Sequence, residues 1–156
     1  MAVQRLHREQ LVSCGVREVA EFFSRPANLA LLTPPGMRFE LLTPEPLEMA
    51  DGTLIEYRVR VRGIPIRCVS QIEDWRPGSG FADRQLRGPY RHWLHRHRFE
   101  AAEGGTRIVD DVDYELRLAP LGDIFAGPLV RRDLARIFDF RQVAAERCLG
   151  VRPAVS

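Results

Sequence analysis

The sequence contains no lysine, so all 23 of its basic residues are arginine, against 21 acidic residues and a net charge of +2. The arginines are spread along the chain and form no basic stripe, which argues against nucleic-acid binding. No apolar run approaches the ~18 residues that a membrane span requires, so membrane insertion is not expected. The N-terminus also lacks the apolar core of a signal peptide, and we therefore expect a cytoplasmic protein.

Cysteine is scarce and chemical motifs are missing. Cys14, Cys68 and Cys148 are odd in number and form no CxxC pair, so we expect three reduced, buried thiols. The sequence has no phosphate-binding loop, no nucleophile elbow and no Ser-His-Asp order. No cofactor is therefore expected.

The length of 156 residues is typical of one domain, and we expect residues 1–156 to form it. The patterning predicts a strand at 4–12, two short helices within 16–33, hairpin-connected strands from 39 to 118 and a helix over 121–149. The clearest strand alternates strictly. Its apolar face holds Ile55, Tyr57, Val59 and Val61, and its polar face holds Glu56, Arg58, Arg60 and Arg62.

The C-terminal helix carries one stripe that is apolar except at Arg141. Such a helix needs a surface on which to bury its stripe, and a sheet with one apolar face supplies it. We therefore predict an α+β fold in which an antiparallel sheet packs against the long helix. The residues of the stripe are Val130, Leu134, Ile137, Phe138, Arg141, Ala145 and Cys148.

Three of the four histidines lie in GPYRHWLHRHRF, residues 88–99. Alternation along a strand places Trp93, His95, His97 and Phe99 on one face, which we expect to point inward, and directs His92 to water.

Carboxylates occupy the inward faces of the two neighbouring strands. Asp83 aligns with Gln85 on one strand, and Asp110 lies on the apolar face of the other. If the hairpins close at the glycines, Asp83, His95 and Asp110 fall roughly opposite one another, about 5 Å apart at Cβ. A register slip of two would replace His95 with His97. We expect an imidazole between carboxylates to stay protonated to a higher pH than a free one.

This polar row has several interpretations. It can be a hydrogen-bonded network that fixes the sheet register and the pocket wall, which we favour because perturbed groups are often structural. It can instead recognise the polar end of a ligand or act in general acid/base catalysis. A metal site is the least favoured interpretation, because His-x-His on a strand is a weak signal by itself.

Three stretches, FADRQLRGPYRHWLHRHRFE, GGTRIVDDVDYEL and LARIFDFR, are similar to a bacterial branch of ligand-binding SRPBCC proteins. The order of elements over nearly the whole chain also resembles that START-like (helix-grip) superfamily, which includes pollen allergens, polyketide cyclases and lipid-transfer domains. The resemblance implies a curved antiparallel sheet of about seven strands around the long helix, with a pocket between them. Cys68 stands where a large aromatic residue is expected, which predicts a roomier cavity there.

The resemblance implies ligand binding but no single activity. The first hypothesis is a carrier or sensor of a small or medium-sized hydrophobic molecule. The second is a polyketide cyclase/dehydratase-like enzyme with His95, His97 and Asp110 as catalytic residues. The third is an accessory protein-interaction domain, like the members of the superfamily that accompany carbon monoxide dehydrogenase. A homodimer is left open. The expected ligand-binding residues are Tyr57, Asp83, Gln85, Trp93, His95, His97, Asp110, Tyr114, Phe138 and Arg141.

Overall fold

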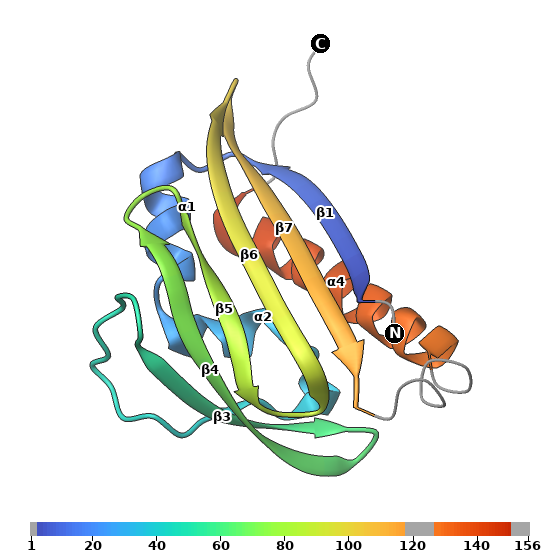
Figure 1. Cartoon of the computed structure of the whole chain (residues 1–156). Helices are drawn as coiled ribbons and strands as arrows, with labels where there is room; N and C mark the ends of the chain where they lie inside the picture. Colours follow the sequence, from blue (N-terminus) through green and yellow to red (C-terminus); the bar gives the residue numbers. More distant parts are fainter. Residues whose placement is uncertain (1–2, 118–126, 151–156) are drawn as a thin grey trace.

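The computed structural model describes residues 3–117 and 127–150 (Figure 1). Within them, a seven-stranded antiparallel sheet has the order β1-β7-β6-β5-β4-β3-β2. The strands are β1 (Gln4–Val12), β2 (Glu40–Leu41), β3 (Leu54–Val61), β4 (Ile64–Arg76), β5 (Gly80–Arg87), β6 (Tyr90–Ala102) and β7 (Gly105–Leu116). The α-helices are α1 (Val16–Phe23), α2 (Leu29–Leu32) and α4 (Gly127–Leu149), with 3₁₀ turns at Pro26–Asn28 and Pro35–Met37.

These elements confirm the predicted α+β helix-grip architecture. The parts of the predicted strand and helix that fall at 118 and at 121–126 lie outside the described residues. Consecutive strands from β2 to β7 pair as neighbours, and β1 returns to pair with β7. Figure 1 shows α4 crossing one face of this curved sheet, with α1 and α2 on the same side.

Two residues with positive φ form the tip between β3 and β4. Arg62 has φ 50° and Gly63 has φ 79°. Positive φ at both central residues is the conformation of two-residue hairpin turns, because it matches the right-handed twist of the strands. The turn carries the end of β3 toward α4, where Arg62 meets Asp133.

The buried face of α4 follows the predicted stripe through Leu134, Phe138, Arg141 and Ala145. The prediction was wrong for Cys148, which is exposed, and Leu149 is buried in its place. Leu149 follows Ala145 by four residues and Cys148 follows it by three. At this end of the helix, the residue four positions on lies on the buried face and the residue three positions on lies beside that face.

The prediction of three buried thiols was correct for one cysteine and wrong for the other two. Cys68 is buried, Cys14 is partly buried and Cys148 is exposed. The buried thiol is the one on an inward face of the sheet, where we predicted a larger cavity.

Buried side chains form two hydrophobic clusters. Phe81 belongs to the larger cluster and stacks on His97 with ring centroids 4.4 Å apart. Phe138 belongs to the smaller cluster, and its ring centroid lies 5.5 Å from that of His95. The two histidines therefore join the clusters, and the polar row lies inside the core.

The outer face of the sheet is less wet than alternation predicts. Leu94 and Val109 alternate with the inward-facing residues of β6 and β7 and so point outward, yet they are buried. Their cross-strand neighbours are long side chains, among them Arg84 beside Leu94 and Arg98 beside Val109. Arginine stems cover apolar neighbours while the charged heads stay in water, which accounts for the burial.

Candidate functional site

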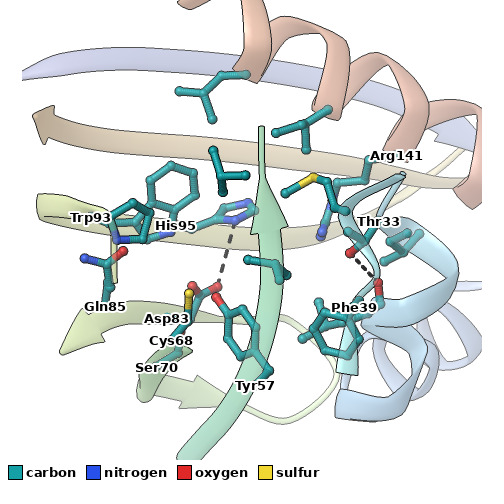
Figure 2. A pocket seen from close by; sticks show the side chains of 18 of the residues that line it. Thr33, Phe39, Tyr57, Cys68, Ser70, Asp83, Gln85, Trp93, His95 and Arg141 are labelled. Carbon is teal, nitrogen blue, oxygen red and sulfur yellow. Dashed lines mark hydrogen bonds and ion pairs between the residues drawn. The ribbon is translucent and has the colours of Figure 1, made fainter. Parts of the chain in front are cut away.

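A cavity of about 700 Å³ lies between the sheet and α4. Strands β3 to β6 supply one wall, and α4 and the segment that contains α2 supply the other. Most of the lining side chains are apolar, such as Phe23, Leu32, Met37, Ile55 and Val59. Figure 2 shows the polar lining residues Asp83, His95 and Tyr57 gathered in one part of this cavity.

Eight of the ten predicted ligand-binding residues line the cavity: Tyr57, Asp83, Gln85, Trp93, His95, His97, Phe138 and Arg141. Asp110 and Tyr114 are not among its lining residues. Asp110 lies on β7, behind the histidines, and borders a separate small cavity with Phe138 and Arg141. Tyr114 packs with Val112, Leu134 and Phe138, because α4 covers β7 at that point. Any effect of Asp110 on a ligand must therefore pass through its neighbours.

In the polar row, the residues that face each other across the strands are not the ones that share a hydrogen bond. Asp83 is opposite His95, and Asp110 is opposite His97, so β7 has the second of the two registers left open by the sequence. The hydrogen bonds nevertheless join His97 Nε2 to Asp83 Oδ2 at 2.6 Å and His95 Nε2 to Asp110 Oδ1 at 2.7 Å. Each carboxylate therefore reaches diagonally past the histidine that it faces.

Arg141 completes this network from α4. Its Nη2 lies 3.4 Å from His97 Nδ1 and 3.9 Å from Asp110 Oδ1. The guanidinium group also lies over the rings of Phe23 and Phe138, at 5.3 and 5.9 Å from their centroids. These contacts hold the side chain inside the molecule, where it is buried.

The protonation of His97 differs from our prediction. Burial, together with the neighbouring His95 and Arg141, lowers the pKa of His97 from 6.5 to about 4, although the hydrogen bond with Asp83 and the charge of Asp83 act to raise it. His97 is therefore neutral at neutral pH. Its Nε2–H donates to Asp83, and its Nδ1 accepts from Arg141, so both ring nitrogens are occupied.

The two carboxylates stay ionised. Burial acts to raise the pKa of Asp83, but the hydrogen bond from His97 and the charges of His95 and Arg141 lower it overall. The pKa of Asp110 is lowered as well, since Arg141 and His95 outweigh the effect of burial. Arg141 balances one of these two negative charges.

His95 offers the cavity one ring nitrogen. Its Nε2–H donates to Asp110, and its Nδ1 lies 3.9 Å from Asp83 Oδ2 and makes no hydrogen bond to any residue that the structure describes. His95 lines the cavity, as Figure 2 shows. The row therefore presents a nitrogen whose opposite side is oriented by a buried carboxylate.

A second polar group on the cavity wall, formed by Tyr57, Cys68 and Ser70, was not predicted as a unit. The Tyr57 hydroxyl hydrogen-bonds with Ser70 and Cys68, and burial raises its pKa, so the phenol stays neutral. Burial also raises the pKa of the Cys68 thiol to about 11. The sequence signal was the alternation of Cys68 and Ser70 with Ile72 on one face of β4, which places small polar groups on an inward surface.

The polar row also contains a candidate cation site. One ligand atom each from Asp83, His95 and His97 lies within 4.8 Å of the others. A metal ion there would have to replace the proton between His97 and Asp83. His97 and Asp83 are already hydrogen-bonded to each other, and the prediction that no metal is bound stays a prediction.

Comparison with known protein families and with curated proteins finds no match to this chain. No helix within residues 3–117 or 127–150 is long and apolar enough to span a membrane.

Solved structures do match over nearly the whole chain. A START superfamily protein from Mycobacterium smegmatis is 14% identical with a TM-score of 0.70, covering 95% of this chain and 97% of its own. The ginseng major latex-like protein 151 from Panax ginseng is 11% identical with a TM-score of 0.70, covering 96% and 99%. The Zhui aromatase/cyclase from Streptomyces sp. R1128 is 19% identical with a TM-score of 0.66, covering 94% and 96%. Together with the curved sheet and the long C-terminal helix, these similarities show that the chain has the START-like (SRPBCC, helix-grip) fold.

Proposed function

We propose that this protein binds a small or medium-sized hydrophobic molecule with a polar end, as a carrier or sensor. The observation that carries the proposal is the cavity of about 700 Å³ between the sheet and α4, whose lining is mostly apolar. Pockets for small molecules typically measure about 300–1,000 Å³ and place a few polar groups among apolar ones. A cavity of this size argues against the accessory interaction domain, which needs no internal space.

The polar end of the ligand is expected at the wall formed by His95, Asp83 and Tyr57. His95 Nδ1 makes no hydrogen bond within the described chain, and it faces the cavity beside the Asp83 carboxylate. Tyr57 keeps its proton because its pKa is raised. A hydroxyl or similar group on the ligand can therefore exchange hydrogen bonds with this wall, while the rest of the molecule displaces water from apolar side chains.

Titration with an apolar fluorescent dye, 1-anilinonaphthalene-8-sulfonate, tests the proposal. We expect saturable binding of one dye per chain, which His95→Gln weakens only modestly because the apolar wall supplies most of the affinity. Native mass spectrometry of protein purified from its own source should show an added mass. Absence of saturable dye binding together with absence of any added mass would contradict ligand binding.

One observation favours an enzymatic alternative. The pairing of His95 Nε2–H with the buried Asp110 leaves Nδ1 aimed at the cavity, an arrangement in which a carboxylate orients an imidazole for general-base catalysis. In a polyketide cyclase/dehydratase-like reaction, His95 would remove a proton from the substrate and return it in a later step. Asp110 would position the ring, and His97 would hold Asp83.

Turnover of a poly-β-ketone mimic separates the two functions. For an enzyme, His95→Gln should abolish turnover while dye binding persists. For a carrier, the wild type shows dye binding and no turnover of the mimic.

A further inference from the structure

The mouth of the cavity is formed by three segments, residues 26–38, 59–65 and 127–137, which we call the rim. Five residues both line the cavity and are exposed to solvent, and all five lie in the rim: Gly36, Arg60, Arg62, Gly63 and Arg136. Arg62 Nη2 contacts both carboxylate oxygens of Asp133, at 3.0 and 2.9 Å, and so joins the tip between β3 and β4 to α4. Within segment 26–38, α2 contacts α4 and the 3₁₀ turn at Pro35–Met37 contacts β3. The three segments of the rim therefore adjoin one another around the opening.

The rim is strongly basic, although the whole chain is nearly balanced. Its segments contain six arginines, and Asp133 is their one acidic residue, whereas the chain has 23 basic and 21 acidic residues. That carboxylate is already paired with Arg62. The arginines are Arg38, Arg60, Arg62, Arg131, Arg132 and Arg136, and all are exposed. This surface is complementary to a negatively charged partner.

The rim also exposes aliphatic side chains. Leu31, Ile64 and Leu129 are 53%, 64% and 43% exposed. Each directly precedes or follows a residue that lines the cavity: Leu32, Gly63 or Val130. Apolar side chains surrounded by arginines are typical of surfaces that lie in the interface of a lipid bilayer.

We propose that the rim docks onto the surface of an anionic membrane and that the cavity exchanges its hydrophobic ligand there. This inference rests on the proposed function. An acidic protein would complement the arginines, but it leaves the three exposed aliphatic side chains without a role. A bilayer accommodates both, since its headgroups attract the arginines and its acyl boundary accepts Leu31, Ile64 and Leu129. It is also the phase in which a poorly soluble ligand accumulates.

Sedimentation with lipid vesicles tests the docking. The wild type should bind vesicles that contain phosphatidylglycerol, bind pure phosphatidylcholine vesicles much less, and lose affinity as salt is raised. Each arginine near an anionic surface contributes about 1 kcal/mol, so Arg131→Gln with Arg132→Gln should weaken binding about 30-fold. Leu129→Ser with Ile64→Ser should weaken it as well. None of these four residues lines the cavity.

Matched controls lie outside the rim. Arg17→Gln with Arg147→Gln removes two exposed charges, and Val143→Ser removes an exposed aliphatic side chain of α4. These variants should bind vesicles within about twofold of the wild type if the rim provides the contact.

Dye binding measured without vesicles separates this proposal from the proposed function. Normal dye binding with no vesicle binding, or with equal losses in rim and control variants, would overturn the docking and leave the carrier function standing. Vesicle binding without dye binding would contradict ligand exchange instead. Failure to bind vesicles of either composition would also favour an acidic protein as the partner of the arginines.

Discussion

His95 and His97 stack with ring centroids 3.7 Å apart and an angle of 25° between their planes. They share a face of β6, yet each hydrogen-bonds a different carboxylate. His97 uses both of its nitrogens within the network, whereas His95 keeps one for the cavity. Two histidines in nearly identical positions on one strand are thus suited to different tasks.

Stability should fall in mild acid because of His97. The pKa of His97 is about 4 in the folded protein and is expected near 6.5 in the unfolded chain, so the unfolded state takes up a proton first as the pH falls. The stabilisation is present above pH 6.5 and is lost progressively down to pH 4. The loss should be about 3 kcal/mol. Urea unfolding at a series of pH values measures it.

A variant and a control identify the group responsible. His97→Gln should flatten the pH dependence in this window, even if it lowers stability throughout. His7 lies on the surface, where the hydrogen bond with Asp111 raises its pKa, so its contribution has the opposite sign and is weakened by solvent. His7→Gln should therefore leave the acid loss in place. An unchanged pH dependence in His97→Gln would contradict the assignment.

Replacing Arg141 with methionine should destabilise the protein strongly. The substitution removes a cation 3.9 Å from Asp110 and leaves the buried Asp110 and the partly buried Asp83 with less compensation. Breaking a buried charge pair costs about 3–5 kcal/mol. Denaturant unfolding measures the change. Arg147→Met, at an exposed site on the same helix, should change stability by no more than about 0.5 kcal/mol. Equal stability of the two variants would show that the histidines alone satisfy the carboxylates.

Enlarging Cys68 should reduce the space for a ligand. The thiol is buried and lines the cavity, so a phenylalanine ring there projects into empty volume instead of a packed core. Cys68→Phe should fold and should bind the dye at least about tenfold more weakly, since the lost volume excludes part of the probe. Cys148→Phe changes an exposed residue and serves as the control. Unchanged dye affinity in Cys68→Phe would place the dye elsewhere.

Gly105 is expected to tolerate no side chain. A Cβ there would collide with the carbonyl oxygen of Val12, at the end of the β1–β7 ladder. Gly105→Ala should therefore separate these strands and cost about 1–3 kcal/mol. A Cβ on Gly15 would meet no atom within 4 Å, so Gly15→Ala should be nearly neutral. Thermal unfolding compares the two variants.

The fold could be predicted from local patterns. Period-two alternation on the strand that holds Ile55 and on the strand that holds His95 identified their inward faces, and the stripe around Phe138 identified the long helix. These signals reflect which side chains avoid water, and the fold buries the faces that carry those side chains. The resemblance to helix-grip proteins then supplied the order of the layers.

The chemistry of the site could be predicted only in part. The sequence brought Asp83, His95 and Asp110 together, but backbone register did not determine which carboxylate bonds which imidazole. That choice depends on side-chain rotamers and on the stacking of His95 on His97. The direction of the His97 pKa also escaped prediction, because the number of carboxylates is visible in a sequence and the degree of burial is not.

The position of Arg141 late in the chain has a consequence for biosynthesis. Both carboxylates of the polar row are translated well before the arginine that compensates them, and the strands that carry them pair as successive hairpins. Until the last helix emerges from the ribosome and settles onto the sheet, Asp83 and Asp110 gain more from hydration than from burial. We therefore expect this face of the nascent sheet to stay hydrated until α4 has been translated and has packed onto it.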